Sequence, residues 1–209
     1  SSRMLKAIAE GNGIEYYDTL TGFKWLGNRA IELRADGVNV LFAYEEALGY
    51  SVGDVVSDKD GVAAASVFVE MASFLHAKSA TVHNYLQSLY KKYGEFVSLN
   101  SYVICHDPVI TASIFSRLRT QGPNGGYWDK AGGGIDIISI KDVTKGYDSS
   151  AVSGDTSTIP ATPDSEMIMF EFANGCTVTL RTSGTEPKIK YYTEKRGAAG
   201  ESRTEVQES

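Results

Sequence analysis

Cysteine and histidine are scarce in this chain, which has two cysteines and three histidines among its 209 residues. Cys105 and Cys176 lie far apart and none of these residues shows metal-ligand spacing, so the sequence indicates neither a disulfide framework nor a zinc site. We expect both thiols to be small buried hydrophobic side chains. With no signal peptide and no long apolar run, so few thiols fit a reducing cytosol, which predicts a cytoplasmic protein without membrane contact.

Positive charge is also in deficit, because the formal net charge is −6 at pH 7 and the sequence pI is about 5.1. Such a balance argues against non-specific binding of nucleic acid or anionic membranes. A hydrophobic content of 42% with only 22% charged residues indicates a globular chain rather than a disordered one. Its length allows one large core or two small ones.

The two ends of the sequence suggest a longer protein. Residue 1 is a serine, and Met4 and Ile8 already show helical spacing, so a helix begins with nothing before it to pack on. We therefore expect sequence upstream. From Gly197 onward the chain is polar, and Val206 is its only large apolar residue. We expect a frayed tail there, or the start of a helix cut before it can pack.

Hydrophobic periodicity, caps and turn residues predict an order of helices and strands. Asp60, Thr81 (or Ser79) and Asp107 are the expected helix caps. We place a hinge around residues 99–101, with a second domain after it. The predicted elements are a helix at 4–10, a strand at 14–17, a helix at 30–34, a strand at 38–44 covered on both faces, a helix at 62–76 with a broad buried face, a helix from 81 to 94, a strand at 96–104, a helix at 108–119, a strand at 135–140, a long loop at 143–166, and strands at 167–172, 177–180 and 189–192.

The last hairpin leads into the segment Arg181-Thr182-Ser183-Gly184-Thr185-Glu186-Pro187-Lys188-Ile189-Lys190. Asn174-Gly175 between its two strands is a strong tight-turn signal. The segment combines a guanidinium, hydroxyls, a glycine and two ammonium groups, which are the groups that hold a phosphate. By composition alone, a solvated turn with ordinary surface charges explains the segment equally well.

The whole string Arg-Thr-Ser-Gly-Thr-Glu-Pro resembles the phosphate-binding loop of the α-D-phosphohexomutases, the phosphoglucomutase family. The resemblance extends to about residue 196 and is strongest to the phosphoglucomutase-2 branch, whose members act as phosphopentomutases as well as phosphoglucomutases. It implies an α/β fold: part of an α/β sandwich domain for sugar recognition at residues 1–100, then a smaller α+β, TATA-box-binding-protein-like domain for phosphate binding at residues 101–209, truncated or disordered at its end.

The resemblance also implies which residues of the loop hold a substrate phosphate. We expect Lys188, on the outgoing strand, to face away from them, because alternate strand residues point to opposite faces. The five implied phosphate-binding residues are Arg181, Ser183, Gly184, Thr185 and Lys190.

Sugar contacts are implied in the first half of the chain. Thr21 and Gly22 precede an aromatic residue and a lysine, as in the family's sugar site. Glu46 falls on the glutamate of the family's Glu-x-Ser-Gly loop, where Leu48 replaces the usual serine. That replacement puts strict glucose specificity in doubt and fits the pentose-tolerant branch. A metal site at Glu45 and Glu46 is the rival interpretation, but no further acids or histidines lie at ligand spacing.

Lys59 directly precedes the predicted cap of the helix at 62–76. The helix dipole disfavours positive charge there and should lower the pKa of the lysine, which would suit it to shuttle a proton or meet a phosphate. An ordinary loop lysine is the alternative. The family carries Lys-Asp-Gly at this place, with the lysine proposed as a general acid/base, so the resemblance implies that Lys59 is catalytic.

Two family motifs do not occur in this sequence: the Thr-Ala-Ser-His-Asn-Pro loop of the phosphoserine and the Asp-Gly-Asp-x-Asp-Arg loop of the magnesium ion. The resemblance implies a full-length Mg²⁺-dependent mutase that interconverts sugar 1- and 6-phosphates, or pentose 1- and 5-phosphates, through a bisphosphate such as glucose 1,6-bisphosphate. Sugar phosphates are then its partners, this chain holds no metal ligand, and alone it is inactive. A glucose 1,6-bisphosphate synthase and a non-catalytic sugar-phosphate-binding module remain alternatives.

Overall fold

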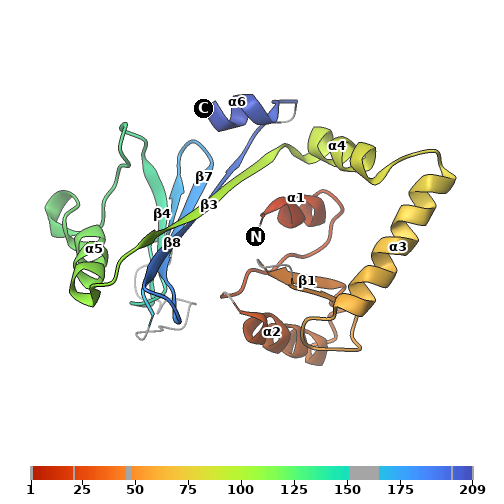
Figure 1. The fold of residues 1–209 in the computed structure, drawn as a ribbon, viewed down its shortest axis with the longest axis horizontal. Helices are drawn as coiled ribbons and strands as arrows, with labels where there is room; N and C mark the ends of the chain where they lie inside the picture. The colour runs from red at the N-terminus through yellow and green to blue at the C-terminus, as the bar shows by residue number, and fades with distance from the viewer. Residues whose placement is uncertain (1, 21, 46–48, 151–164, 199, 209) are drawn as a thin grey trace. The chain divides into compact units, whose positions relative to one another are not determined.

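The computed structural model describes residues 2–20, 22–45, 49–150, 165–198 and 200–208, and the chain divides into two compact units, Ser1–Gly94 and Glu95–Ser209 (Figure 1). Thr21, Glu46 and Leu48 lie outside the described residues. The units meet in sequence at Gly94, where the backbone leaves a helix with a positive φ of 95°. Within the described residues, no helix has the length and apolar content needed to cross a membrane.

The first unit combines helices with a two-stranded antiparallel hairpin. Two predicted caps are confirmed: Asp60 accepts hydrogen bonds from Val62 N and Ala63 N, both at 3.0 Å, and Thr81 accepts one from Asn84 N at 3.1 Å. The elements of the first unit are α1 (Met4–Glu10), α2 (Phe23–Ala35), β1 (Phe42–Glu45), β2 (Gly49–Val52), α3 (Gly61–Ala77) and α4 (Val82–Tyr93).

Three predictions about the first unit are wrong. Residues 14–17 form no strand, and the tyrosine hydroxyls there donate to nearby carboxylates, Tyr16 to Asp18 at 2.6 Å. The strand predicted at 38–44, covered on both faces, is shorter and more open than expected: β1 begins only at Phe42, which is 40% exposed, and among the described residues it pairs with β2 alone. The broad buried face of α3 is absent, since Leu75 is its buried residue and Phe68 is 54% exposed.

The second unit is built on a six-stranded antiparallel sheet in the order β3-β8-β7-β6-β4-β5. The predicted hairpin is confirmed, and Gly175 takes the positive φ of 78° that its turn requires. The elements of the second unit are β3 (Phe96–Ile104), α5 (Pro108–Thr120), the short 3₁₀ helix η1 (Pro123–Gly125), β4 (Ile137–Asp142), β5 (Tyr147–Asp148), β6 (Met167–Phe172), β7 (Cys176–Thr182), β8 (Lys188–Arg196) and α6 (Arg203–Glu208).

One face of this sheet packs against α5, as Figure 1 shows, and forms the core of the second unit. Asp107 caps α5 by accepting a hydrogen bond from Val109 N at 2.8 Å, which confirms the predicted helix start. Phe115 from α5 is fully buried against apolar residues that alternate along the strands. The buried core residues are Phe115, Ile140, Ile168, Phe170 and Ile189.

Two expectations about the second unit need correction. Residues 99–101 form no hinge, because they lie inside β3 and pair with residues 191–193 of β8. The tail is not frayed at Val206: this side chain of α6 is 1% exposed, and a Cβ added to Gly197 would lie only 2.2 Å from its Cγ2. Gly197 therefore makes the room that lets the short last helix pack.

Replacing Phe115 with alanine should lower the free energy of unfolding of the second unit by about 3–5 kcal/mol, because a fully buried ring is lost and a cavity remains. Urea unfolding measured by circular dichroism checks this. Val109→Ala on the same helix is the control, since Val109 is 74% exposed and its loss should change stability by less than about 0.5 kcal/mol. Equal losses in both variants would contradict the packing of α5 through Phe115.

Candidate functional site

The segment between β7 and β8 is closed by its own backbone. The amide of Ser183 donates to the carbonyl of Lys188 at 2.9 Å, and the amide of Lys188 donates to the carbonyl of Glu186 at 2.7 Å. Just before this loop, Arg181 lies directly opposite Lys190 in the β7–β8 register. Directly opposed residues of an antiparallel pair share a face, so both cations lie on the face of the sheet that Ile189 does not occupy.

The guanidinium of Arg181 is held by a tyrosine rather than by an acid. Its Nε and Nη2 donate to the hydroxyl of Tyr192 at 3.3 and 3.1 Å. The side chain is half-buried, and within the described part of the chain no carboxylate forms an ion pair with it. Tyr192 therefore orients a positive charge that no carboxylate of the described residues pairs with.

The two lysines that follow the loop share one carboxylate. Glu186 accepts a hydrogen bond from Lys188 Nζ at 2.7 Å, and its other oxygen lies 3.8 Å from Lys190 Nζ. Lys188 Nζ also lies 4.2 Å from the centre of the Tyr102 ring. The prediction that Lys188 faces away is wrong, because every second residue of a strand points to the same face, and Lys188 and Lys190 therefore share one. The hydrogen bond from Lys188 holds the pKa of Glu186 below its ordinary value.

Gly184 stands at the exposed tip of the loop. Its φ is not among the positive ones, and an added Cβ would meet no atom within 4 Å. The fold of the loop thus does not itself require a glycine at this position. Of its neighbours, Ser183 is half-buried and Thr185 is exposed.

In the first unit, Lys59 lies against the β1–β2 hairpin. Its Nζ is 3.6 Å from Glu45 Oε1 and 3.3 Å from Asp58 Oδ1, and it lies 4.9 Å from the centre of the Phe23 ring. Its aliphatic stem crosses Gly49, where an added Cβ would lie 2.7 Å from Lys59 Cδ. Lys59 thus lies at the end of β1, beside Glu45, which directly precedes Glu46 in the sequence. The carboxylates of Glu45 and Asp58 offset the unfavourable interaction between the ammonium group and the helix dipole.

Gly22 directly precedes α2 and takes a φ of 119°, a conformation that side chains other than glycine rarely adopt. Its carbonyl accepts a hydrogen bond from Trp25 N at 2.9 Å, which starts the helix. Of the three predicted sugar contacts, Gly22 alone falls among the described residues, and Thr21 and Glu46 lie outside them.

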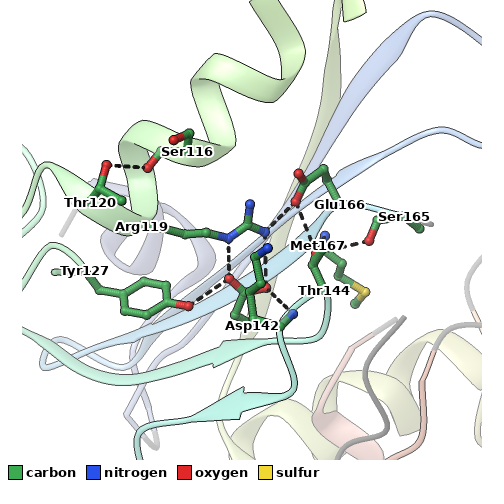
Figure 2. Close-up of polar contacts among 10 residues, drawn as sticks. Ser116, Arg119, Thr120, Tyr127, Asp142, Thr144, Ser165, Glu166 and Met167 are labelled. Carbon is green, nitrogen blue, oxygen red and sulfur yellow. Dashed lines mark hydrogen bonds and ion pairs between the residues drawn. The ribbon is translucent and has the colours of Figure 1, made fainter. Parts of the chain in front are cut away.

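Sequence reasoning missed a buried cluster of charges in the second unit, shown in Figure 2. Arg119 Nε donates to Asp142 Oδ2 at 2.6 Å, and Arg119 Nη2 donates to both Asp142 and Glu166. Tyr127 donates a hydrogen bond from its hydroxyl to Asp142 at 2.9 Å, and burial together with this bond raises the pKa of the tyrosine. Asp142 is fully buried, whereas the side chain of Glu166 is 26% exposed. No spacing rule links these residues in the sequence, because long-range folding brings them together.

The two thiols lie in different surroundings, and Cys105 packs against the core around Phe115. Cys105 and Cys176 are half-buried rather than fully buried, and burial raises the pKa of Cys176. Over the described residues, no three side chains from histidine, cysteine, aspartate or glutamate gather in a way that could hold a metal ion.

Comparison with known proteins places these features in a family context. Residues 1–93 match the family described as phosphoglucomutase/phosphomannomutase, alpha/beta/alpha domain III. Over 208 residues the chain is 47% identical to a human glucose 1,6-bisphosphate synthase, with all of this chain and 33% of that protein covered. It is 46% identical to human phosphopentomutase, covering 97% of this chain and 33% of the relative, and 39% identical to a Saccharomyces cerevisiae phosphoribomutase, covering 93% and 33%. The chain thus spans about a third of the length of these relatives.

Replacing Lys188 with methionine should raise the pKa of Glu186 toward its ordinary value, because its hydrogen-bonded cation is lost. The depressed pKa means that the ion pair contributes stability above the unfolded-state pKa of about 4.3, and that this contribution is lost as the pH falls through the folded pKa. Titration followed by NMR of the Glu186 carboxyl carbon measures the shift. Lys188→Arg should keep the pKa low, and an unchanged pKa in the methionine variant would refute the pairing.

Proposed function

We propose that the full-length protein is a sugar-phosphate mutase. The chain belongs to the phosphoglucomutase/phosphomannomutase superfamily, in the branch that contains the phosphopentomutases and glucose 1,6-bisphosphate synthases. The full-length protein interconverts a sugar 1-phosphate with its 6-phosphate, or a pentose 1-phosphate with its 5-phosphate, through a bisphosphate. On this proposal the loop between β7 and β8 holds the phosphate that is not reacting.

The observation that carries the proposal is the state of Arg181. Its guanidinium is half-buried, oriented by Tyr192, and paired with no carboxylate among the described residues, and Lys190 lies opposite it. A planar guanidinium can give two parallel hydrogen bonds to a phosphate, and Lys190 adds a second positive charge. A solvated turn would not need a cation oriented in this way.

Gly184 supports the same proposal. Since neither φ nor packing within the fold requires glycine there, room for a ligand explains the residue better. A phosphate that approaches the backbone closely would meet a Cβ at this point. Ser183 and Thr185, on either side, would add hydroxyl donors.

Sugar recognition and proton transfer are assigned to the first unit. Thr21, Gly22 and Glu46 would contact the sugar hydroxyls, and Lys59 would act as the general acid/base. Lys59 is supported by its place at the end of β1, where Glu45 lies 3.6 Å from its ammonium group. For the second unit we assign the TATA-box-binding-protein-like fold of the family's fourth domain, which an antiparallel sheet with α5 on one face supports.

A magnesium ion is expected in this family, but the residues described in this chain do not fit one. The ion and the phosphoserine would be provided by parts of the full-length protein other than these residues. What this chain's own residues contribute is binding and orientation of the sugar phosphate, and we expect the chain alone to be inactive.

Replacing Arg181 with alanine should weaken binding of ribose 1-phosphate and glucose 1-phosphate about ten- to a hundredfold, because charge-assisted hydrogen bonds to phosphate are lost. Isothermal titration calorimetry of the chain measures both ligands, and their ratio reports the preferred sugar. Lys130→Ala is the control: it removes an equal charge from the same unit, and the Lys130 side chain is 58% exposed in its ion pair with Asp136. Equal affinities in the two variants would refute the assignment of Arg181.

Replacing Gly184 with alanine should weaken the same ligands while leaving the unfolding midpoint unchanged, because the added methyl group meets only the ligand. Binding and thermal unfolding are measured on one sample. A lower midpoint would mean that the fold itself requires this glycine, and unchanged affinity would mean that the phosphate does not approach it.

Glucose 1,6-bisphosphate synthase is the second candidate, because human and mouse synthases are 47% and 46% identical to the chain while human phosphopentomutase is 46% identical. The full-length protein decides between them. A synthase transfers phosphate from 1,3-bisphosphoglycerate to glucose 1-phosphate, whereas a mutase interconverts its sugar phosphates without that donor. Binding without either activity would identify a non-catalytic sugar-phosphate-binding protein.

A further inference from the structure

We infer that Glu166 is a positioning residue for the phosphate loop: anchored by the guanidinium of Arg119, whose side chain is only 11% exposed, it holds Thr182 and thereby fixes the directions of Arg181 and Ser183. This inference rests on the proposed role of the loop in binding phosphate. None of the three residues Arg119, Glu166 and Thr182 would itself touch the ligand.

The first step is the double hydrogen bond between Glu166 and Thr182. The amide of Thr182 donates to the carbonyl of Glu166 at 2.9 Å, and the amide of Glu166 donates to Thr182 Oγ1 at 3.2 Å. Thr182 is the last residue of β7, so these bonds extend the β6–β7 pairing by one residue and tie down the strand end at which the loop begins.

The second step is the anchor of Glu166 itself. Its Oε2 accepts hydrogen bonds from Arg119 Nη2 and, at 3.2 Å, from the hydroxyl of Thr144, as Figure 2 shows. Thr144 Oγ1 also accepts a hydrogen bond from Met167 N at 2.9 Å. The same hydroxyl also lies 3.1 Å from the carbonyl of Ser165, so Thr144 contacts the residues before and after Glu166. Turning the backbone of Glu166 away from Thr182 would break these contacts or the hydrogen bond with Arg119.

The third step is the rigidity of Arg119. Asp142 is fully buried and receives hydrogen bonds from Arg119 Nε and Nη2, from the hydroxyl of Tyr127 and from Lys145 N at 3.2 Å. Moving Arg119 would leave this carboxylate buried without its charge partner, which is strongly unfavourable. The guanidinium is therefore a fixed point, and burial of its charge is outweighed by these hydrogen bonds, which raise its pKa.

The last step concerns the neighbours of Thr182. Arg181 and Ser183 are its direct neighbours in the sequence. The backbone direction at Thr182 therefore sets where the guanidinium of Arg181 and the hydroxyl of Ser183 lie. Productive ligand contacts require placement within about half an ångström. A loosened Thr182 should therefore cost phosphate affinity even where the sheet remains folded.

The test compares Thr182→Val with Thr182→Ser. Valine keeps the shape of threonine but cannot accept the hydrogen bond from Glu166 N, whereas serine retains the acceptor. Affinity for glucose 1-phosphate and ribose 1-phosphate is measured by calorimetry, and hydrogen exchange of the amides of residues 182–185 is measured by NMR without ligand. We expect affinity about fivefold weaker and faster loop exchange in the valine variant, with both restored by serine.

Glu166→Gln provides a second variant that should fold, since glutamine keeps the backbone contacts with Thr182 and a neutral acceptor for Arg119. We expect it to speed exchange of the same loop amides. Asp136→Asn is the matched control, because it neutralises an acid of the same unit in an exposed ion pair with Lys130 at 2.9 Å. Equal effects of the two substitutions would overturn the inference.

The remaining outcomes separate this inference from the proposed function. Unchanged loop exchange in Thr182→Val, or faster exchange with unchanged affinity, would show that the contact is merely structural and would overturn positioning. If serine fails to restore what valine removes, the hydroxyl is not the acting group and the inference also fails. If the unmodified chain binds neither sugar phosphate, the phosphate role of the loop fails, and positioning of a ligand fails with it, whatever the exchange shows about loop order.

Discussion

The register between β7 and β8 decides on which face of the sheet each residue of the candidate site lies. Ile189 pairs with Thr182 and is buried in the core beside α5, whereas the neighbouring pair, Arg181 and Lys190, occupies the other face. A slip of one residue would carry Lys190 into the apolar core and Ile189 into solvent. The burial of a single isoleucine thus enforces the pairing that gathers the cations.

The cluster around Arg119 adds a second constraint at the edge of that pairing. One guanidinium faces two carboxylates, Asp142 and Glu166, so the cluster carries a formal charge of −1. Such a buried group adds little stability compared with apolar packing, yet breaking it costs about 3–5 kcal/mol because an unpaired charge remains. The cluster joins α5, which carries Arg119, to the end of β4 and to the residue directly before β6.

Local signals in the sequence were reliable where a few neighbouring residues determine the structure. Asn174-Gly175 fixed the β6–β7 turn, and Asp60, Thr81 and Asp107 capped the helices that they were predicted to cap. The alternation of side chains between the two faces of the last strands was also predicted correctly. The face of Lys188 was not, because this residue shares the face of Lys190.

Burial and long-range contacts were not predictable in the same way. The apolar period of α3 is present in the sequence, but periodicity cannot say whether a partner surface exists, and Phe68 and Val69 remain exposed. Val206 was assigned to a loose tail, because nothing in the local sequence shows that Gly197 leaves space for it. Arg119, Asp142 and Glu166 stand 23 or more residues apart, so only the folded sheet unites them.

The distribution of charge in the loop explains how an acidic protein could bind an anion there. Lys188 and Lys190 already share Glu186, so a phosphate would have to exchange with a carboxylate to reach them. Arg181 donates to the hydroxyl of Tyr192, and a phosphate could accept hydrogen bonds from its other N–H groups without breaking any ion pair seen among the described residues. On the proposed function, Arg181 should therefore contribute the largest share of the binding energy. The lysines, whose charge Glu186 offsets before binding, would contribute mainly to the attraction of the ligand at a distance.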